Sequence, residues 1–289
     1  MQIVVLTLLT LIAFAANSVL CRLALLTDSI DPLTFTGVRL VSGALVLVLL
    51  VKLQRRTPGE GELRPRLLAG LALFSYALAL SLAYLQLDTG TGALVLFGSV
   101  QLTLIAIDKW RGARVVLLEW SGMALAFAGL VYLMLPGVSA PPLAALLLMM
   151  ISGISWGWYT YLGRGSQQPV ADSSANFVLS LPWMMAALLV GLLLSGYQFH
   201  AANAGLFYAI ASGAVTSALG YAIWYRVLPS LSATEAAVLQ LLVPILAAMG
   251  GLIWAAEPIT LRLVVASLLV LSGIACVIVG RRYLRANSG

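Results

Sequence analysis

Long apolar runs alternate with short polar breaks along nearly the whole chain. The runs carry few charges, whereas the breaks are rich in charged residues, proline and glycine. A helix that crosses the hydrocarbon core of a bilayer needs about 20 apolar residues, and the runs have about that length. The pattern therefore predicts ten transmembrane helices. They are expected at residues 3–25, 32–53, 65–86, 90–107, 115–135, 142–163, 173–195, 203–225, 232–254 and 260–280.

The breaks between these runs leave no room for a water-soluble domain. The longest lies at residues 52–66 and includes the turn-prone stretch RRTPGEGELRPR. The first run has no basic leader, and no small-residue cleavage site precedes the acidic residues Asp28 and Asp31, so we expect a retained helix rather than a cleaved signal peptide. The predicted fold class is an all-α polytopic membrane protein.

Composition supports a membrane environment. Of 289 residues, 62% are hydrophobic and only 9% are charged, whereas a soluble domain carries roughly 25% charged residues. So few charges do not cover the surface of a water-soluble protein of this size. The solvent for most of the chain is therefore expected to be lipid.

The basic residues indicate an orientation. A net charge of +6 is compatible with nucleic-acid binding, but the distribution of the 16 Lys and Arg favours a topology signal and no nucleic-acid partner. Only Arg22 and Arg262 fall near one face, and Arg39 lies inside a span. The positive-inside rule then places both termini in the cytoplasm. The remaining basic residues share the cytoplasmic face: Lys52, Arg55, Arg56, Arg64, Arg66, Lys109, Arg111, Arg114, Arg164, Arg226, Arg281, Arg282 and Arg285.

The two halves of the chain resemble each other. FAANSVLCR at residues 14–22 matches WGWYTYLGR 142 positions later, TGALVL matches TEAAVL at an offset of 143, and AGLVYL matches SGIACV at an offset of 144. Three matches in order at nearly one offset predict a repeat. Each unit holds five spans, so the units enter the membrane from opposite sides, and a solute site is expected between them near the midplane. The units are residues 1–135 and 142–280, followed by a basic tail at 281–289.

Three segments carry a resemblance to a known family: DPLTFTGVRL at residues 31–40, the Phe14 to Asn17 run with its counterpart WGWYT, and VPILAAMGGLIWAAEPIT at residues 243–260. Over nearly its whole length the chain resembles the drug/metabolite transporter superfamily, in the EamA-type form with two five-helix repeats. The amino-terminal run is most similar to amino-acid exporters, including the branch for aromatic amino acids. One departure is that the first half has the basic KWRGAR run where the second half has Glu257, so it lacks the expected carboxylate.

The candidate substrate-binding residues are aromatic and polar side chains well inside the predicted helices. Trp156 and Tyr159 share a helical face with Ser155, and Phe14 and Asn17 are their repeat counterparts. The alternative is that such aromatics belong to the membrane interface or to packing. Other candidates at helical spacing are Tyr76 with Leu80, Phe97 with Gln101, Tyr221, and Gln240.

Two kinds of residue leave a choice of roles. Arg39, about two turns inside its span, either clamps a solute carboxylate with its fork of donors or has a structural role. Tyr84 and Tyr225 fall near helix ends and are expected at the membrane interface.

Features of enzymes and pumps are absent from the sequence. His200 is the single histidine, and no Cys/His cluster has the spacing of zinc ligands. The two lysines, Lys52 and Lys109, lie outside any phosphate-binding GxxxxGK[ST] motif. We therefore expect no catalytic residue, no metal and no cofactor.

The predicted function is a secondary carrier that exports amino acids, apolar or aromatic ones above all, by alternating access in a bacterial inner membrane. Efflux of organic cations or other metabolites, and a pore, are the alternatives. The expected partners are a small-molecule substrate and membrane lipid, and the sequence leaves the oligomeric state open. No carboxylate falls at the middle of a predicted span, so obligatory proton coupling is not expected.

Overall fold

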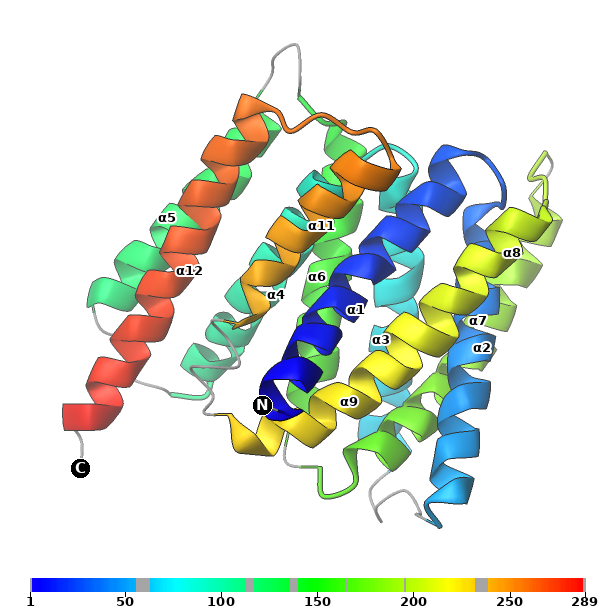
Figure 1. Cartoon of the computed structure of the whole chain (residues 1–289), viewed down its shortest axis with the longest axis horizontal. Coiled ribbons are helices and arrows are strands. Elements are labelled where there is room, and N and C mark those ends of the chain that lie inside the picture. Colours follow the sequence, from blue (N-terminus) through cyan, green and yellow to red (C-terminus); the bar gives the residue numbers. More distant parts are fainter. Residues whose placement is uncertain are drawn as a thin grey trace.

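The computed structural model is a bundle of helices (Figure 1). It contains no strand among its described residues, where the one β-type contact is an isolated bridge between Ile30 and Ala201. An all-helical fold satisfies the backbone hydrogen bonds within each segment, as a lipid environment requires. The structure describes residues 2–55, 63–112, 117–135, 140–164, 166–194, 196–231 and 239–287.

Eight helices within these ranges are long and apolar enough to cross a membrane, and two apolar helices are shorter, Leu117–Leu133 and Leu242–Trp254. The elements, in chain order, are α1 (Gln2–Leu26), α2 (Pro32–Leu53), α3 (Leu63–Tyr84), α4 (Thr89–Trp110), α5 (Leu117–Met134), α6 (Leu143–Leu162), α7 (Pro169–Leu193), α8 (Asn203–Ile210), a π-helical segment (Ala211–Leu219), α9 (Gly220–Val227), a 3-10 turn (Leu228–Ser230), α11 (Leu242–Trp254) and α12 (Leu261–Asn287).

Most predicted segments coincide with helices to within a few residues, and three differ. The eighth, Asn203–Val227, is one apolar span interrupted by the π-helical segment. The described part of the ninth is α11, because residues 232–238, including Glu235, lie outside the described residues. The last helix continues to Asn287, seven residues beyond the predicted end at 280.

The helices are arranged in successive groups (Figure 1). Helices α5 and α12 pair with each other at one side and pack next on α4. Their close approach depends on Gly122 and Gly273, because a side chain at either would overlap backbone atoms of the other helix. Small residues at helix contacts are the usual means of close packing in membranes. Helix α1 is central and contacts α11, α9, the π-helical segment and α3.

Both chain ends lie at the same end of the bundle, which we call the terminal end (Figure 1). The opposite, distal end holds the α1–α2 and α7–α8 connections. There, Asp31 caps α2 by accepting a hydrogen bond from the Thr34 amide at 2.9 Å, and Pro32 occupies the first helical position. Asp31 also accepts from the His200 amide and the Tyr197 hydroxyl, and it thereby ties the two connections together.

Candidate functional site

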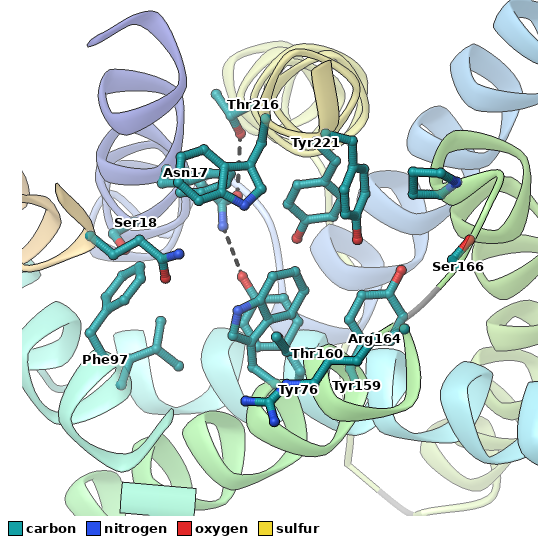
Figure 2. Close-up of a pocket in the computed structure, with 18 of the residues that line it drawn as sticks. Asn17, Ser18, Tyr76, Phe97, Tyr159, Thr160, Arg164, Ser166, Thr216 and Tyr221 are labelled. Atoms are coloured by element: carbon teal, nitrogen blue, oxygen red, sulfur yellow. Dashed lines mark hydrogen bonds between the residues drawn. The ribbon is translucent and has the colours of Figure 1, made fainter. Parts of the chain in front are cut away.

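A pocket of about 370 Å³ extends from the middle of the bundle to its terminal end (Figure 2). It lies between helices of the first predicted unit (α1, α3 and α4) and of the second (α6, the π-helical segment and α9). The volume is at the small end of the ~300–1,000 Å³ range typical of ligand pockets. The lining residues are Phe14, Asn17, Ser18, Tyr76, Leu96, Phe97, Trp156, Tyr159, Thr160, Gly163, Arg164, Ser166, Pro169, Thr216, Tyr221, Trp224, Tyr225, Pro229 and Gln240.

Trp156 is the centre of an aromatic cluster. Its ring centroid lies 4.7 Å from that of Tyr76, 5.1 Å from that of Tyr159 and 5.2 Å from that of Tyr221. Phe14 continues the cluster, with its ring 5.9 Å from the Tyr221 ring. These separations are those of favourable aromatic pairs. Trp156 and Tyr159 lie three residues apart on α6, so one helical face supplies two of the rings.

The approach of α6 to its neighbours depends on small residues. Gly153 and Gly157 face α4, and a Cβ at either would overlap Leu96 or Thr103. Ser152 donates to the Tyr76 backbone oxygen at 2.9 Å and so joins α6 to α3. This packing holds the aromatic face of α6 against the ring of Tyr76.

The polar side of the pocket is a network around Asn17. The Asn17 side-chain oxygen accepts hydrogen bonds from Ser212 at 2.7 Å and Thr216 at 3.3 Å. The Asn17 amide nitrogen donates to the Tyr76 hydroxyl at 3.1 Å. Figure 2 shows Thr216, Asn17 and Tyr76 joined in this way. The network links α1, α3 and the π-helical segment, and such segments are frequent at functional sites.

Arg39 lies next to this network. It is 2% exposed, and its Nη2 atom donates to the Tyr76 hydroxyl at 3.0 Å. Its guanidinium carbon lies 5.1 Å from the Tyr76 ring centroid. The π-helical segment approaches closely, since a Cβ at Gly213 would overlap the Arg39 backbone oxygen. Tyr76 lines the pocket and Arg39 does not, so Arg39 contacts the site through Tyr76.

The structure brings most of the predicted site residues together. Those that line the pocket are Phe14, Asn17, Tyr76, Phe97, Trp156, Tyr159, Tyr221 and Gln240. Those that do not are Arg39, which lies behind Tyr76, Leu80, which is fully buried, and the partly buried Gln101 and Ser155.

The expected interface positions of two tyrosines are wrong. Tyr84 is fully buried at the distal end, because its ring packs against Gly92, and Tyr225 lines the pocket. Sequence reasoning also missed Ser212 and Thr216. Their spacing of four residues in an apolar span was the available signal, because it places both hydroxyls on one helical face.

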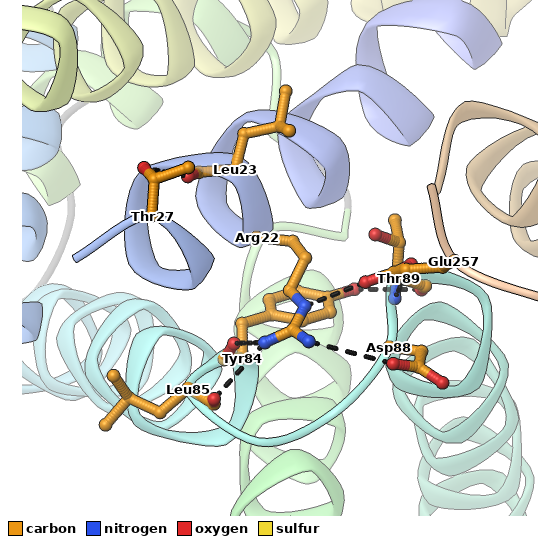
Figure 3. A network of polar contacts seen from close by, with 8 residues as sticks. All are labelled: Arg22, Leu23, Thr27, Tyr84, Leu85, Asp88, Thr89 and Glu257. Atoms are coloured by element: carbon orange, nitrogen blue, oxygen red, sulfur yellow. Dashed lines mark hydrogen bonds and ion pairs between the residues drawn. The ribbon is translucent and has the colours of Figure 1, made fainter. Parts of the chain in front are cut away.

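A buried ion pair lies at the distal end (Figure 3). The Arg22 Nε atom lies 2.8 Å from the Glu257 carboxylate, and both side chains are 8% exposed. Arg22 also donates to the Tyr84 backbone oxygen at 2.8 Å, and Asp88 lies 3.7 Å away. The second Glu257 oxygen accepts from the Thr89 amide at 2.7 Å. The ion pair therefore joins α1 to the end of α11 and to the start of α4.

Local backbone geometry positions Glu257. Helix α11 ends at Trp254, and Ala256 then adopts a φ of 52°, a left-handed conformation that L-residues other than glycine, asparagine and aspartate rarely adopt. The chain reverses, and the Glu257 amide donates back to the Gly251 oxygen. Burial and the negative charge of the nearby Glu257 carboxylate raise the pKa of the Asp88 carboxyl, although the positive charge of Arg22 opposes the shift.

A second ion pair lies at the terminal end, at the mouth of the pocket. Arg164, which the predicted repeat aligns with Arg22, lies 2.7 Å from the Asp108 carboxylate, and the two side chains of this pair are 45% and 23% exposed. Asp108 directly precedes the KWRGAR run and is the carboxylate that pairs with Arg164 at this end. Each ion pair joins the first predicted unit to the second, but only the distal pair is buried.

Eight apolar helices of membrane-spanning length and a pocket with aromatic and polar walls define the class, a polytopic membrane protein with a binding site for a small molecule. The EamA-like transporter family model matches residues 143–279. Over this stretch the chain is similar to EamA-like transporters.

Proteins from several organisms are similar to this chain. The uncharacterized protein PA1977 of Pseudomonas aeruginosa is 49% identical over 286 residues, covering 98% of this chain and 97% of its own. An uncharacterized transporter of Archaeoglobus fulgidus is 24% identical over 86% of this chain and 89% of its own. The uncharacterized inner membrane transporter YedA of Escherichia coli K12 is 28% identical over 57% of this chain and 55% of its own.

A known crystal structure shares the fold. It superposes with a TM-score of 0.62, covering 95% of this chain and 99% of its own, at 18% sequence identity. Identity at that level shows the architecture alone. The relatives that are described as transporters indicate a transporter rather than an enzyme.

Proposed function

We propose that the protein is a secondary carrier of small organic solutes, with apolar and aromatic amino acids as the favoured class, in a bacterial inner membrane. The observation that carries this proposal is the pocket between the two predicted units, which combines the Trp156 aromatic cluster with the Asn17 hydrogen-bond network. The location follows the E. coli relative, which is described as an inner membrane transporter.

The pocket chemistry suits an amino acid. Aromatic faces at Trp156, Tyr159 and Tyr221 hold an apolar or aromatic side chain, and they also attract an ammonium group. Hydroxyl and amide groups at Thr216, Asn17 and Tyr76 supply the hydrogen bonds that orient the polar end. A cavity of about 370 Å³ limits the solute to a small molecule.

The two ion pairs suit alternating access. The pocket extends to the terminal end, whereas the buried Arg22–Glu257 pair closes the distal end. In an alternating-access cycle, one unit rocks against the other around a fixed site near the midplane. We infer that this structure is the state open toward the termini. The Arg164–Asp108 pair is already formed at the mouth in this state, so the step that opens the distal end is the separation of the buried Arg22–Glu257 pair.

Organic cations are the second candidate class, because aromatic walls alone can bind them. Arg39 has no carboxylate partner among the described residues, and its positive charge behind Tyr76 disfavours a second cation in the same pocket. A pore is the third possibility, and the closed distal end counts against it.

The test is a counterflow assay with purified protein in liposomes, using a panel of amino acids and organic cations. A carrier exchanges labelled external solute for unlabelled solute trapped inside, and the exchange saturates. The expected result is saturable counterflow of apolar and aromatic amino acids. Exchange of organic cations alone would reject the substrate class, and an ohmic current without counterflow would reject the carrier.

A further inference from the structure

The Tyr76 hydroxyl accepts two hydrogen bonds from the protein. One comes from Arg39 Nη2 at 3.0 Å and the other from Asn17 Nδ2 at 3.1 Å. A phenolic oxygen has two acceptor positions and one proton to donate. Both acceptor positions are therefore occupied, and the O–H proton is left for a third partner. Tyr76 lines the pocket, so a bound solute is in a position to be that partner.

The direction of these bonds follows from the neighbours of Asn17. A guanidinium cannot accept a hydrogen bond, so Arg39 must be the donor to Tyr76. The Ser212 hydroxyl donates to the Asn17 side-chain oxygen at 2.7 Å, and the Thr216 hydroxyl donates to the same oxygen at 3.3 Å. This orientation turns the Asn17 NH₂ group toward Tyr76. Asn17 is thus a donor to Tyr76 as well.

The positive charge of Arg39 has no carboxylate partner among the described residues. All ion pairs in that part of the chain involve other basic groups, and Arg39 Nη1 makes no hydrogen bond there. A buried cation without a counter-charge is costly, and such residues in a membrane bundle mark solute or ion pathways. A solute anion that accepts a hydrogen bond from the Tyr76 hydroxyl would supply the missing negative charge, with only that hydroxyl between it and Arg39.

We propose that the Tyr76 hydroxyl binds the carboxylate of the solute as a donor, and that Arg39 is a positioning residue that acts through it. This inference rests on the proposed carrier function and deepens it by naming the group recognised. Arg39 holds the hydroxyl in place and strengthens its O–H as a donor by its charge, since hydrogen bonds to charged groups are stronger than neutral ones. The solute's apolar part then lies on the Trp156 cluster.

The test compares two solutes that differ by one group. L-phenylalanine has a carboxylate, and 2-phenylethylamine is the same molecule without it. Binding to purified protein is measured by the change in tryptophan fluorescence, and exchange is measured by counterflow. Wild-type protein is expected to prefer phenylalanine. In Tyr76→Phe, which keeps the ring against Trp156, this preference is expected to fall by about 10- to 100-fold, the size of a hydrogen bond to a charged group.

Control variants separate recognition from folding. Tyr208→Phe removes the hydroxyl of a tyrosine on α8 that is not part of the pocket lining and is expected to keep the wild-type preference. Arg39→Gln is expected to lose most of the preference, and Arg39→Lys to retain part of it, because lysine keeps the charge. A purely structural arginine would lower protein stability and both solutes' binding equally. If Tyr76→Phe does not fold, the inference is tested by comparing the solute preference of Arg39→Gln with that of Arg39→Lys.

Unchanged preference in Tyr76→Phe, or equal losses for both solutes in the Arg39 variants, would overturn the inference and leave the carrier proposal standing. Failure of wild-type protein to exchange any member of the amino-acid and cation panel would instead reject the proposed function.

Discussion

Asn17 connects three elements through one side chain. It joins α1 to Tyr76 on α3 and to Ser212 and Thr216 in the π-helical segment. Its burial makes each of these bonds important, because an unsatisfied buried polar group costs about 1–3 kcal/mol. A few buried hydrogen bonds therefore hold the helices together around the pocket, while the aromatic rings supply the area that contacts a solute.

The role of Trp156 is tested by a pair of tryptophans on the same helix. Trp156→Ala removes ring contacts to three pocket tyrosines and is expected to weaken binding of aromatic solutes about 10-fold, because each ring pair contributes about 0.5–1.5 kcal/mol. Trp158, two residues away, is 37% exposed and does not line the pocket. Trp158→Ala is the matched control and is expected to bind these solutes like the wild type. Equal effects of both variants on binding would show that Trp156 only packs.

Asp31 gives a pH-dependent contribution to stability. Burial raises the pKa of its carboxyl, but the hydrogen bonds from Thr34, the His200 amide and Tyr197 outweigh burial, and the net pKa lies below its ordinary value. Because the folded-state pKa is depressed, this stability is present above the unfolded-state pKa of about 4 and is lost as pH falls through the folded-state pKa.

Asp31→Asn would turn an NH₂ group toward a donor, the His200 amide, and is expected to lower the free energy of unfolding by about 1–3 kcal/mol at pH 7. The measurement is the melting temperature in detergent as a function of pH. The difference from wild type should shrink below about pH 4. A difference independent of pH would contradict the argument.

At the scale of elements, the two ion pairs have the same arrangement and different environments. Arg22 on α1 and Arg164 after α6 each reach a carboxylate of the other predicted unit. The distal pair is buried and bonded on several sides, whereas the terminal pair is partly exposed. An exposed pair contributes about 0.2–1 kcal/mol, while breaking a buried one costs about 3–5 kcal/mol. That difference favours the state that is closed at the distal end.

Glu257→Gln leaves Arg22 as a buried charge without its nearest partner and is expected to destabilise this state by about 3–5 kcal/mol. Arg164→Gln, the matched change at the terminal end, should cost about 1 kcal/mol or less. Melting temperatures measure the costs. Reaction of a cysteine reporter, Ser18→Cys on the pocket wall, with impermeant reagent from the distal side should increase only in Glu257→Gln. Equal reactivity in both variants would show that the distal pair does not close the pocket.

At the scale of the whole molecule, the end that carries both termini is predicted to face the cytoplasm. Gln54 follows α2 at that end, and Gln86 precedes α4 at the distal end, and both are exposed. In a Cys276→Ser background, Gln86→Cys should react with impermeant thiol reagent on intact cells, and Gln54→Cys only after lysis. Cys21 is fully buried and should stay unreactive. The reverse labelling would invert the orientation.

Transport is expected to proceed without obligatory proton coupling. Tightly coupled proton carriers rely on a carboxylate or histidine within the bundle. The pocket lining of the described chain contains neither, and the buried carboxylates Glu119 and Glu257 are not part of that lining. Solute-driven pH change in liposomes with a trapped pH dye, with and without an ionophore clamp, measures the coupling. A fixed number of protons per solute, abolished by Glu235→Gln at a position outside the described residues, would contradict this expectation.

The sequence by itself determined the helices and much of the pocket's aromatic wall. Helical hydrogen bonds are local, and a run of apolar residues predicts a membrane helix without knowledge of its neighbours. The face of α6 with Trp156 and Tyr159 could be found for the same reason, since helical periodicity places residues three apart on one side. The repeat then suggested Phe14 and Asn17 as their counterparts.

Only the tertiary structure decided which polar groups meet. Ser212 contacts Asn17 across 195 positions of sequence, and Glu257 contacts Arg22 across 235. Periodicity within a helix gives no information about such pairs, which depend on how the helices pack. Asp108 as partner of Arg164, the burial of Tyr84 and the placement of Arg39 behind Tyr76 were set in the same way. These contacts decide where the pocket is closed and which groups face a solute, because both depend on distances between helices.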